Sequence, residues 1–253
     1  MSSLRPYKPL LEALYARYHQ PLYRSLDPVE IVWGYTHPED QAIAGLWAAL
    51  FAWGRRSVAI QKAHALLQSL APSPYAYLRT GQVLRISLRH RTWKPETITR
   101  LWEKLRELYG RCGSLAGFFR PYRESLWEGV AAFQAEMTKG APELRRHLGD
   151  LRAGSASKRL WLWLRWMIRK DAIDPGPWAG TFSAAQLHIP LDVHLLAWAR
   201  QTGIVSDSAP SWRAVVQLTE AFREITPNDP LRYDFALLTA SALGEIQKVT
   251  SPS

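Results

Sequence analysis

The segment KRLWLWLRWMIR, residues 158–169, constrains the fold of this chain more than any other stretch. If it is helical, large apolar side chains cover nearly every angle around its axis; these are Leu160, Trp161, Leu162, Trp163, Leu164, Trp166, Met167 and Ile168. A helix that is apolar on all sides is stable in water only when other elements surround it. We therefore expect a buried central helix with the rest of the chain packed around it.

Helical patterns separated by short turns dominate the remaining sequence. Proline and acidic residues open DPVEIVWGY (27–35) and HPEDQAIAGLWAALFAWG (37–54), as they do at helix N-termini. Similar patterns predict helices over 57–70, 95–109, 121–138, 142–152, 155–169, 191–202, 210–225 and 230–247. Only VLRISLRHRT, residues 83–92, alternates as a short strand does. The sequence therefore predicts an all-α fold, either as one large domain or as two closely packed lobes.

The chain is strongly basic, which bears on its partners. Lys and Arg number 32 against 22 Asp and Glu, and the formal net charge is +10. Such an excess attracts polyanions, most commonly nucleic acid. Some of the 12 tryptophans must be core residues, but aromatic rings beside basic side chains also suit stacking on bases. Nucleic acid is thus the favoured partner, and a basic surface without such a partner is the alternative.

Several kinds of site are disfavoured by the sequence. Cys112 is the only cysteine, so one chain cannot form an internal disulfide framework or a four-cysteine iron–sulfur site. His188, Asp192 and His194 do not share one helix face, because Pro190 lies among them, and no metalloprotease motif accompanies them. No signal peptide, membrane-spanning run or nucleotide fingerprint is evident. We expect a cytoplasmic monomer with no metal, no cofactor and no membrane contact.

Two polar features flank apolar helices and need an explanation. In IPLDVHLLAWAR, residues 189–200, Asp192 follows Pro190 and precedes an apolar run, which is typical of a residue that caps a helix. Lys158 and Arg159 begin the central helix, although cations at a helix N-terminus oppose the helix dipole. A bound anion or a chemical role would account for these two cations.

The same segments resemble a known enzyme family. LRAGSASKRLWLWLRWMI (151–168), followed by IPLDVHLLAWARQTGI (189–204), resembles the centre of the helix–hairpin–helix DNA glycosylases. Gly154 stands four residues before Lys158, as the first hairpin glycine stands before the catalytic lysine of that family. Asp192-Val193-His194 takes the place of the family's Asp-Thr-His. The glycosylase resemblance is specific only over about residues 150–205.

A wider resemblance covers most of the chain. From DPVEIVWGY (27–35) to DPLRYDFALL (229–238) the sequence is similar to DUF2400, an uncharacterised family of bacterial and archaeal proteins. The chain departs from the glycosylase pattern at two hairpin positions and in the Asp-Thr-His segment. Ala156 replaces the second hairpin glycine, Ser157 replaces the residue after it, and Val193 replaces the threonine. Ala156 restricts the close approach of the backbone to a phosphate, because only glycine adopts every backbone conformation freely.

The glycosylase resemblance implies a two-lobed helical fold with a central hairpin–helix element and a cleft between the lobes. One lobe would comprise about residues 40–150, and the other residues 1–39 together with 151–253, in a single unit of residues 1–253. A damaged nucleotide would be flipped out of double-stranded DNA into the cleft. The hairpin, formed by Gly154, Ser155, Ala156 and Ser157, would bind a DNA phosphate with help from Arg159. Lys158 would attack C1′ of the sugar, while Asp192 would stabilise the positive charge that develops there.

The lysine assignment has a rival within the sequence. A lysine acts as a nucleophile only when unprotonated, and apolar surroundings, a nearby cation and the positive end of a helix favour that state. Lys158 begins the most apolar helix and adjoins Arg159, whereas Lys170 has an ordinary explanation at the negative end of the same helix. About 18 Å of helix separates the two lysines. We therefore expect Lys158, rather than Lys170, to be the nucleophile.

Other residues are candidates for contacts with DNA. FAWGRRSV (51–58) lies where the family has a loop that wedges into the duplex, so Trp53 would fill the gap and Arg55 and Arg56 would contact phosphates. A buried helix-end tryptophan with two solvated arginines is the alternative. RISLRHRTWK (85–94), with Arg85, Arg89, Arg91, Lys94 and His90 around Trp93, is favoured as a solvated face over a DNA-binding one.

The candidate base pocket has four members. They are Trp178, His194, Tyr233 and Asp234. Trp178 and Tyr233 are equally explained by core packing. Asp234 lies in an apolar helix and needs a partner, so it is either an ion-pair member or an acceptor for the flipped base.

These observations lead to a functional hypothesis with two alternatives. The first is a DNA glycosylase of base excision repair that acts at the nucleoid, with or without AP lyase activity, and removes a damaged, oxidised base. The second is a non-catalytic protein that binds DNA or RNA structures with the same fold. A scaffold protein without affinity for nucleic acid is a third. The sequence does not identify the damaged base, because a few hydrogen bonds in the pocket decide specificity.

Overall fold

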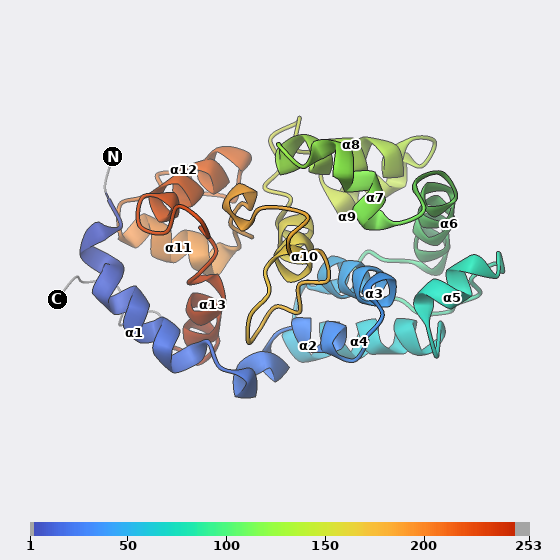
Figure 1. Ribbon diagram of the computed structural model, residues 1–253, viewed down its shortest axis with the longest axis horizontal. Coiled ribbons are helices and arrows are strands. Elements are labelled where there is room, and N and C mark those ends of the chain that lie inside the picture. Colours follow the sequence, from blue (N-terminus) through green and yellow to red (C-terminus); the bar gives the residue numbers. More distant parts are fainter. Residues whose placement is uncertain (1–2, 246–253) are drawn as a thin grey trace.

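The fold is helical throughout the described chain. A computed structural model describes residues 3–245, and within them short turns and loops join the helices (Figure 1). No strand occurs in this range, where the only β-pairings are isolated bridges at His90–Trp93, Ser155–Ser211 and Ala179–Phe182. The predicted all-α fold is therefore confirmed. No helix of the described chain has the length and apolar character needed to cross a membrane.

The described α-helices differ in length from four to eighteen residues. The α-helices are α1 (Lys8–Tyr18), α2 (Val29–Trp33), α3 (Pro38–Phe51), α4 (Arg56–Gln68), α5 (Pro74–Arg79), α6 (Pro95–Cys112), α7 (Leu115–Phe119), α8 (Leu126–Thr138), α9 (Arg145–Leu148), α10 (Lys158–Ile168), α11 (Val193–Gln201), α12 (Trp212–Arg223) and α13 (Asp234–Ala242). The 3-10 helices are η1 (Arg5–Tyr7), η2 (Pro21–Leu26), η3 (Arg120–Tyr122), η4 (Pro142–Leu144) and η5 (Ala184–Gln186).

Helix α10 lies at the centre of the molecule, as its sequence predicts. Figure 1 shows α1, α11, α12 and α13 on one side of it and α2 to α9 on the other. Every residue from Leu160 to Ile168 is buried. Helix α10 packs against α3, and the indole nitrogen of Trp163 donates a hydrogen bond of 3.0 Å to the carbonyl of Ala42 in α3. The first helix, α1, packs against the last, α13, so both ends of the chain contribute to the same side.

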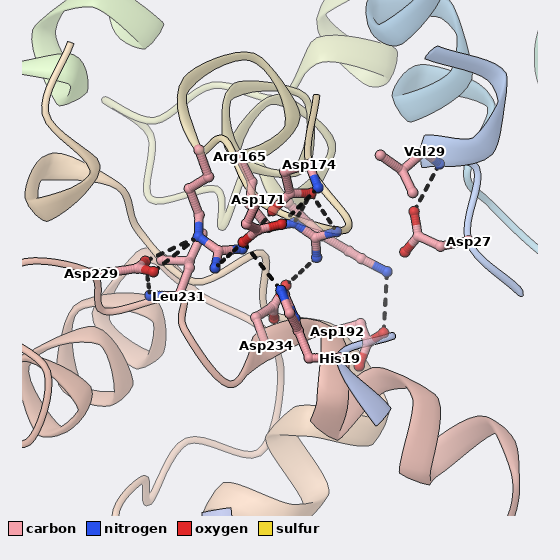
Figure 2. Close-up of polar contacts among 12 residues, drawn as sticks. His19, Asp27, Val29, Arg165, Asp171, Asp174, Asp192, Asp229, Leu231 and Asp234 are labelled. Atoms are coloured by element: carbon pink, nitrogen blue, oxygen red, sulfur yellow. Dashed lines mark hydrogen bonds and ion pairs between the residues drawn. The ribbon is translucent and has the colours of Figure 1, made fainter. Parts of the chain in front are cut away.

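One charged side chain, Arg165, is completely buried in this apolar helix. Its guanidinium group donates to Asp234 at 2.6 Å and to Asp174 at 3.2 Å (Figure 2). One turn later, Arg169 also pairs with Asp174 and donates two bonds of 3.1 Å to Asp229. Burial opposes the charge of Arg165, but the two aspartates outweigh it and raise the pKa of the guanidinium. The second half of α10 is thus fixed by acids from the loops that follow it and from the start of α13.

Some predicted elements have different boundaries from those in the structure. Residues 83–92 form no strand. The segment is a loop whose C-terminal part is anchored by side chains, since the indole nitrogen of Trp93 donates to Leu50 O and the His90 ring bonds to Phe51 O. The predicted helix 142–152 is wrong beyond Leu148, because Gly149 has a φ of +80° and ends α9.

Three other predicted helices are shorter than expected. Helix 121–138 is interrupted between η3 and α8, and helix 155–169 begins only at Lys158. Helix 230–247 is helical from Asp234 to Ala242, and its last two positions, 246 and 247, lie outside the described residues.

A partly buried histidine makes the stability of this fold depend on pH. His188 lies 4.7 Å from the ring of Trp161 and 4.8 Å from that of Trp212. Burial lowers its pKa from 6.5 to about 3, with a smaller contribution from the charge of Arg223. The unfolded chain therefore binds a proton at His188 that the folded chain excludes. The contribution of neutral His188 to stability is complete above pH 6.5 and is lost as the pH falls toward 3.

We expect the wild type to lose about 2 kcal/mol more unfolding free energy between pH 7 and pH 5 than His188→Phe, which keeps a ring but cannot titrate. Urea denaturation at the two pH values measures the difference. His64→Gln, at an exposed position, serves as the control. Equal pH dependence in the wild type and His188→Phe would contradict the burial argument.

Candidate active site

The structure brings Lys158 and Asp192 together, although 34 positions separate them in the chain. The amine nitrogen of Lys158, the first residue of α10, lies 3.1 Å from Oδ2 of Asp192, which immediately precedes α11 (Figure 2). Both side chains are partly accessible, at 31% for Lys158 and 16% for Asp192. They line one cleft of about 930 Å³. This volume is within the roughly 300–1,000 Å³ typical of small-molecule sites.

Asp192 uses its two oxygens for two different purposes. Oδ1 accepts hydrogen bonds from the backbone N–H groups of His194 (3.0 Å) and Leu195 (2.9 Å), which confirms the predicted helix cap. Oδ2 accepts from Lys158. Burial acts to raise the pKa of Asp192, but the charge of Lys158 and the N–H of Leu195 outweigh it, so the pKa is lowered. The charge of Lys158 and the helix cap therefore keep Asp192 ionised, and the cap orients it toward the cleft.

The turn between α9 and α10 positions Lys158. Gly154 has a φ of +85°, and the next left-handed residue is Ser157, at +45°, directly before the helix. Ala156, which stands where the glycosylase family has its second hairpin glycine, does not adopt a positive φ. Ser157 thus adopts the left-handed conformation, which is rare for a non-glycine residue, and it does so where the chain enters α10.

Gly149 and Gln134 hold this turn in place. A Cβ atom on Gly149 would lie 2.7 Å from the hydroxyl of Ser155 and 2.9 Å from that of Ser157, so only glycine fits. The buried amide of Gln134, in α8, donates 2.8 Å hydrogen bonds to Leu148 O and to the Ser157 hydroxyl, and it accepts from the N–H of Leu151 at 2.9 Å. One side chain therefore connects both ends of the turn.

Most of the predicted DNA-contacting residues lie along the same cleft. Its lining includes Trp53, Arg56, Ser155, Ala156, Ser157, Arg159, His194 and Asp234. Trp53 is 40% exposed, so the alternative of a buried tryptophan is excluded for this residue. Arg55 is exposed but does not line the cleft, and Gly154 shapes the turn without lining it.

The structure corrects two of the candidates for the base pocket. Trp178 is 3% exposed and packs against Trp163, at 5.2 Å between ring centroids, and against Phe119 and Phe182. Tyr233 is fully buried, and its hydroxyl donates to Glu12 at 2.6 Å. Neither residue lines the cleft, because aromatic packing in the core uses both side chains.

The structure also gives the positions of two further candidates, Asp234 and Lys170. Asp234 lines the cleft but gives Oδ2 to Arg165, so it has the predicted ion pair. Lys170 lies beyond the end of α10, is exposed, and does not line the cleft. Of the two lysines, only Lys158 faces Asp192.

Sequence reasoning missed two residues that shape the site. Gln134 gives only a weak signal, as a single amide within the apolar helix LWEGVAAFQAEMT. Asp27 was recognised as part of a helix start, and its Oδ1 does accept from the N–H of Val29 at 2.9 Å. Asp27 also lines the cleft, however, and its other oxygen is buried without a hydrogen-bond partner among the described residues. Among residues 3–245, no group of three or more His, Cys, Asp or Glu side chains is arranged to hold a metal ion.

Comparison with known proteins identifies a family but no function. The model of a family described as a protein of unknown function, DUF2400, matches residues 27–242. The match includes both Lys158 and Asp192, together with all of α10. No curated protein and no solved structure matches the chain.

Proposed function

The chain belongs to the DUF2400 family, and we propose that it is a DNA glycosylase that removes a damaged base with Lys158 as the nucleophile. The observation that carries the proposal is the 3.1 Å contact between the Lys158 amine and the Asp192 carboxylate in one accessible cleft. An amine beside a permanent carboxylate suits substitution at a sugar carbon that becomes positively charged in the transition state.

The chemistry follows from these two groups. After the ammonium group of Lys158 has lost a proton to solvent, its amine attacks C1′. The glycosidic bond breaks, and the base leaves with the bonding electrons and takes up a proton from solvent. The C1′–O4′ bond then opens, O4′ takes the proton that the nitrogen releases, and an iminium Schiff base is formed. Loss of a proton from C2′ expels the 3′ phosphate and cleaves the strand, which is the lyase reaction.

Asp192 has two tasks in this scheme. In the resting enzyme it holds the Lys158 amine by a hydrogen bond. During reaction its charge stabilises the oxocarbenium character that develops at C1′ and O4′. Both tasks require an anion, and the lowered pKa of Asp192 provides it at neutral pH.

The charge of the chain supports DNA as the substrate. The formal net charge of +10 favours association with a polyanion, and Arg56, Arg159 and Trp53 line the cleft beside Lys158. A base within a duplex cannot reach such a cleft, so the nucleotide must be flipped out of the stack. A protein with this activity works on DNA in the cytoplasm, at the nucleoid.

Borohydride trapping tests the proposal. We expect the wild-type protein, incubated with duplexes that each carry one oxidised base or an abasic site, to form a covalent adduct when the Schiff base is reduced. Gel electrophoresis detects both the adduct and the cleaved strand. The absence of an adduct and of cleavage with every duplex would contradict the proposal. Binding to DNA that is unaffected by Asp192→Asn, without any product, would instead favour a non-catalytic binding protein.

A further inference from the structure

Three side chains from distant parts of the chain meet at the edge of the cleft. They are Trp53, between α3 and α4, Arg91, in the loop before α6, and Arg159, in the first turn of α10. The guanidinium carbons of Arg91 and Arg159 lie over the Trp53 ring, at 5.3 and 5.9 Å from its centroid. Each distance is within the range of a cation–π interaction. The arrangement therefore places two positive charges on one exposed ring.

The position of Arg91 is fixed by the backbone. Arg91 has a φ of 57°, a conformation that non-glycine residues rarely adopt. Its guanidinium covers Gly54, where an added Cβ would lie 3.0 to 3.1 Å from the guanidinium atoms. A glycine next to Trp53 thus permits the close approach of Arg91.

Neither arginine has an acidic partner among residues 3–245. Within the described part of the chain, Arg91 makes no ion pair or hydrogen bond through its guanidinium group, and Arg159 makes only two long hydrogen bonds, of 3.4 Å, to the carbonyls of Leu50 and Arg146. Burial lowers the pKa of Arg159 to about 10. By contrast, Arg165 and Arg169 at the other end of α10 each pair with at least two aspartates. In the first turn of α10, the charge of Arg159 is therefore not neutralised by any acidic side chain of the described residues.

The geometry suits one kind of anion. A guanidinium group that stacks on a ring uses its face, so the N–H donors in its plane remain available for oxygen acceptors. Two such groups on one ring suit the tetrahedral oxygens of a phosphate, which arginine commonly binds with two parallel hydrogen bonds. Because Arg159 directly follows Lys158, the phosphate would adjoin the nucleotide that reacts in the cleft.

We infer that Trp53, Arg91 and Arg159 form a binding site for one phosphate of a nucleic-acid backbone, next to the nucleotide held in the cleft. The inference rests on the proposed function and adds a contact that fixes the register of the substrate. It gives Trp53 the role of holding two arginines, which differs from the wedge expected from the sequence.

The test uses a duplex with a tetrahydrofuran abasic analogue, which the enzyme can bind but cannot convert. A series of duplexes carries one neutral methylphosphonate at each position beside the analogue. We expect one position in the series to weaken wild-type binding by about 10-fold, as loss of a charge-assisted contact does. Arg91→Ala/Arg159→Met is expected to bind the unmodified duplex about 10- to 100-fold less tightly and to be insensitive to that methylphosphonate. Its salt dependence should correspond to about one phosphate contact fewer.

Arg89→Ala is the matched control, since Arg89 is an exposed arginine of the same loop that forms no cation–π contact with Trp53. It should retain the methylphosphonate effect. Arg91→Lys, which keeps the charge but not the planar group, should lose most of the effect, and a circular dichroism melt checks that each variant is folded. If every methylphosphonate weakens the wild type and the double variant equally, the phosphate site is wrong while the glycosylase proposal stands. If the wild type does not bind the duplex at all, both are overturned.

Discussion

Lys158→Gln is expected to abolish the borohydride-trapped adduct and to reduce strand cleavage by at least about 1,000-fold, because glutamine has no amine to attack C1′. Glutamine keeps a polar side chain of similar reach at the first position of α10. The loss should therefore reflect chemistry and not folding. Binding to the tetrahydrofuran duplex should fall far less than cleavage, since the other residues along the cleft are unchanged.

Lys170→Gln is the matched control for this experiment. Lys170 belongs to the same segment but is exposed and lies outside the cleft, so its replacement should leave the adduct intact. An undiminished adduct in Lys158→Gln would contradict the assignment of the nucleophile. If Lys170→Gln then lost the adduct, the attacking amine would have to reach the substrate from the opposite end of α10.

Local features of the sequence predicted the parts of the site that local interactions form. Asp192 was predicted to cap a helix because it follows Pro190 and precedes an apolar run, and its Oδ1 does accept two backbone N–H groups. The two cations at the start of α10 indicated an unusual environment because they oppose the helix dipole. Both features depend only on residues that are neighbours in the chain. They can therefore be predicted from a single sequence.

Long-range packing decided the features that the sequence did not predict. Trp178 and Tyr233 were candidates for the base pocket because of their residue types. In the structure Trp178 packs against Trp163, and the hydroxyl of Tyr233 donates to Glu12, so both side chains lie in the core. The predicted helix 142–152 ended early because Gly149 must approach the hydroxyls of Ser155 and Ser157. The hydrogen bonds from Gln134 to Leu148 O and the Ser157 hydroxyl depend on the distance between α8 and the turn. No periodicity in the sequence predicts that distance.

Arg165 is a further residue whose role depends on long-range packing. The sequence analysis did not single out Arg165, and its partners, Asp174 and Asp234, come from segments whose positions only the fold determines. This arginine joins the central helix to the loop that follows it and to α13. Its pairing with Asp234, which lines the cleft, connects the stability of the fold to the shape of the site.

Arg165→Met is accordingly expected to lower the free energy of unfolding by about 3–5 kcal/mol, because it leaves the buried carboxylate of Asp234 without a cation and leaves Asp174 with Arg169 alone. Methionine fills much of the same volume, so the loss should come from the uncompensated charge and not from a cavity. Urea denaturation at pH 7 measures it, with the slope of the transition as a check that unfolding remains two-state. Arg100→Met removes a partly exposed pair with Glu103 in α6 and should cost less than about 1 kcal/mol.

A second replacement separates charge from packing at this position. Asp234→Asn added to Arg165→Met removes the carboxylate that has lost its cation, so the double variant should regain part of the lost stability. A loss below about 1 kcal/mol in Arg165→Met, or no recovery in the double variant, would show that the aspartates do not depend on Arg165. Since the same helix carries Lys158 at its other end, a misplaced α10 would also move the amine away from Asp192. A partly stable Arg165→Met protein should therefore lose trapping activity in greater proportion than it loses binding to the abasic duplex.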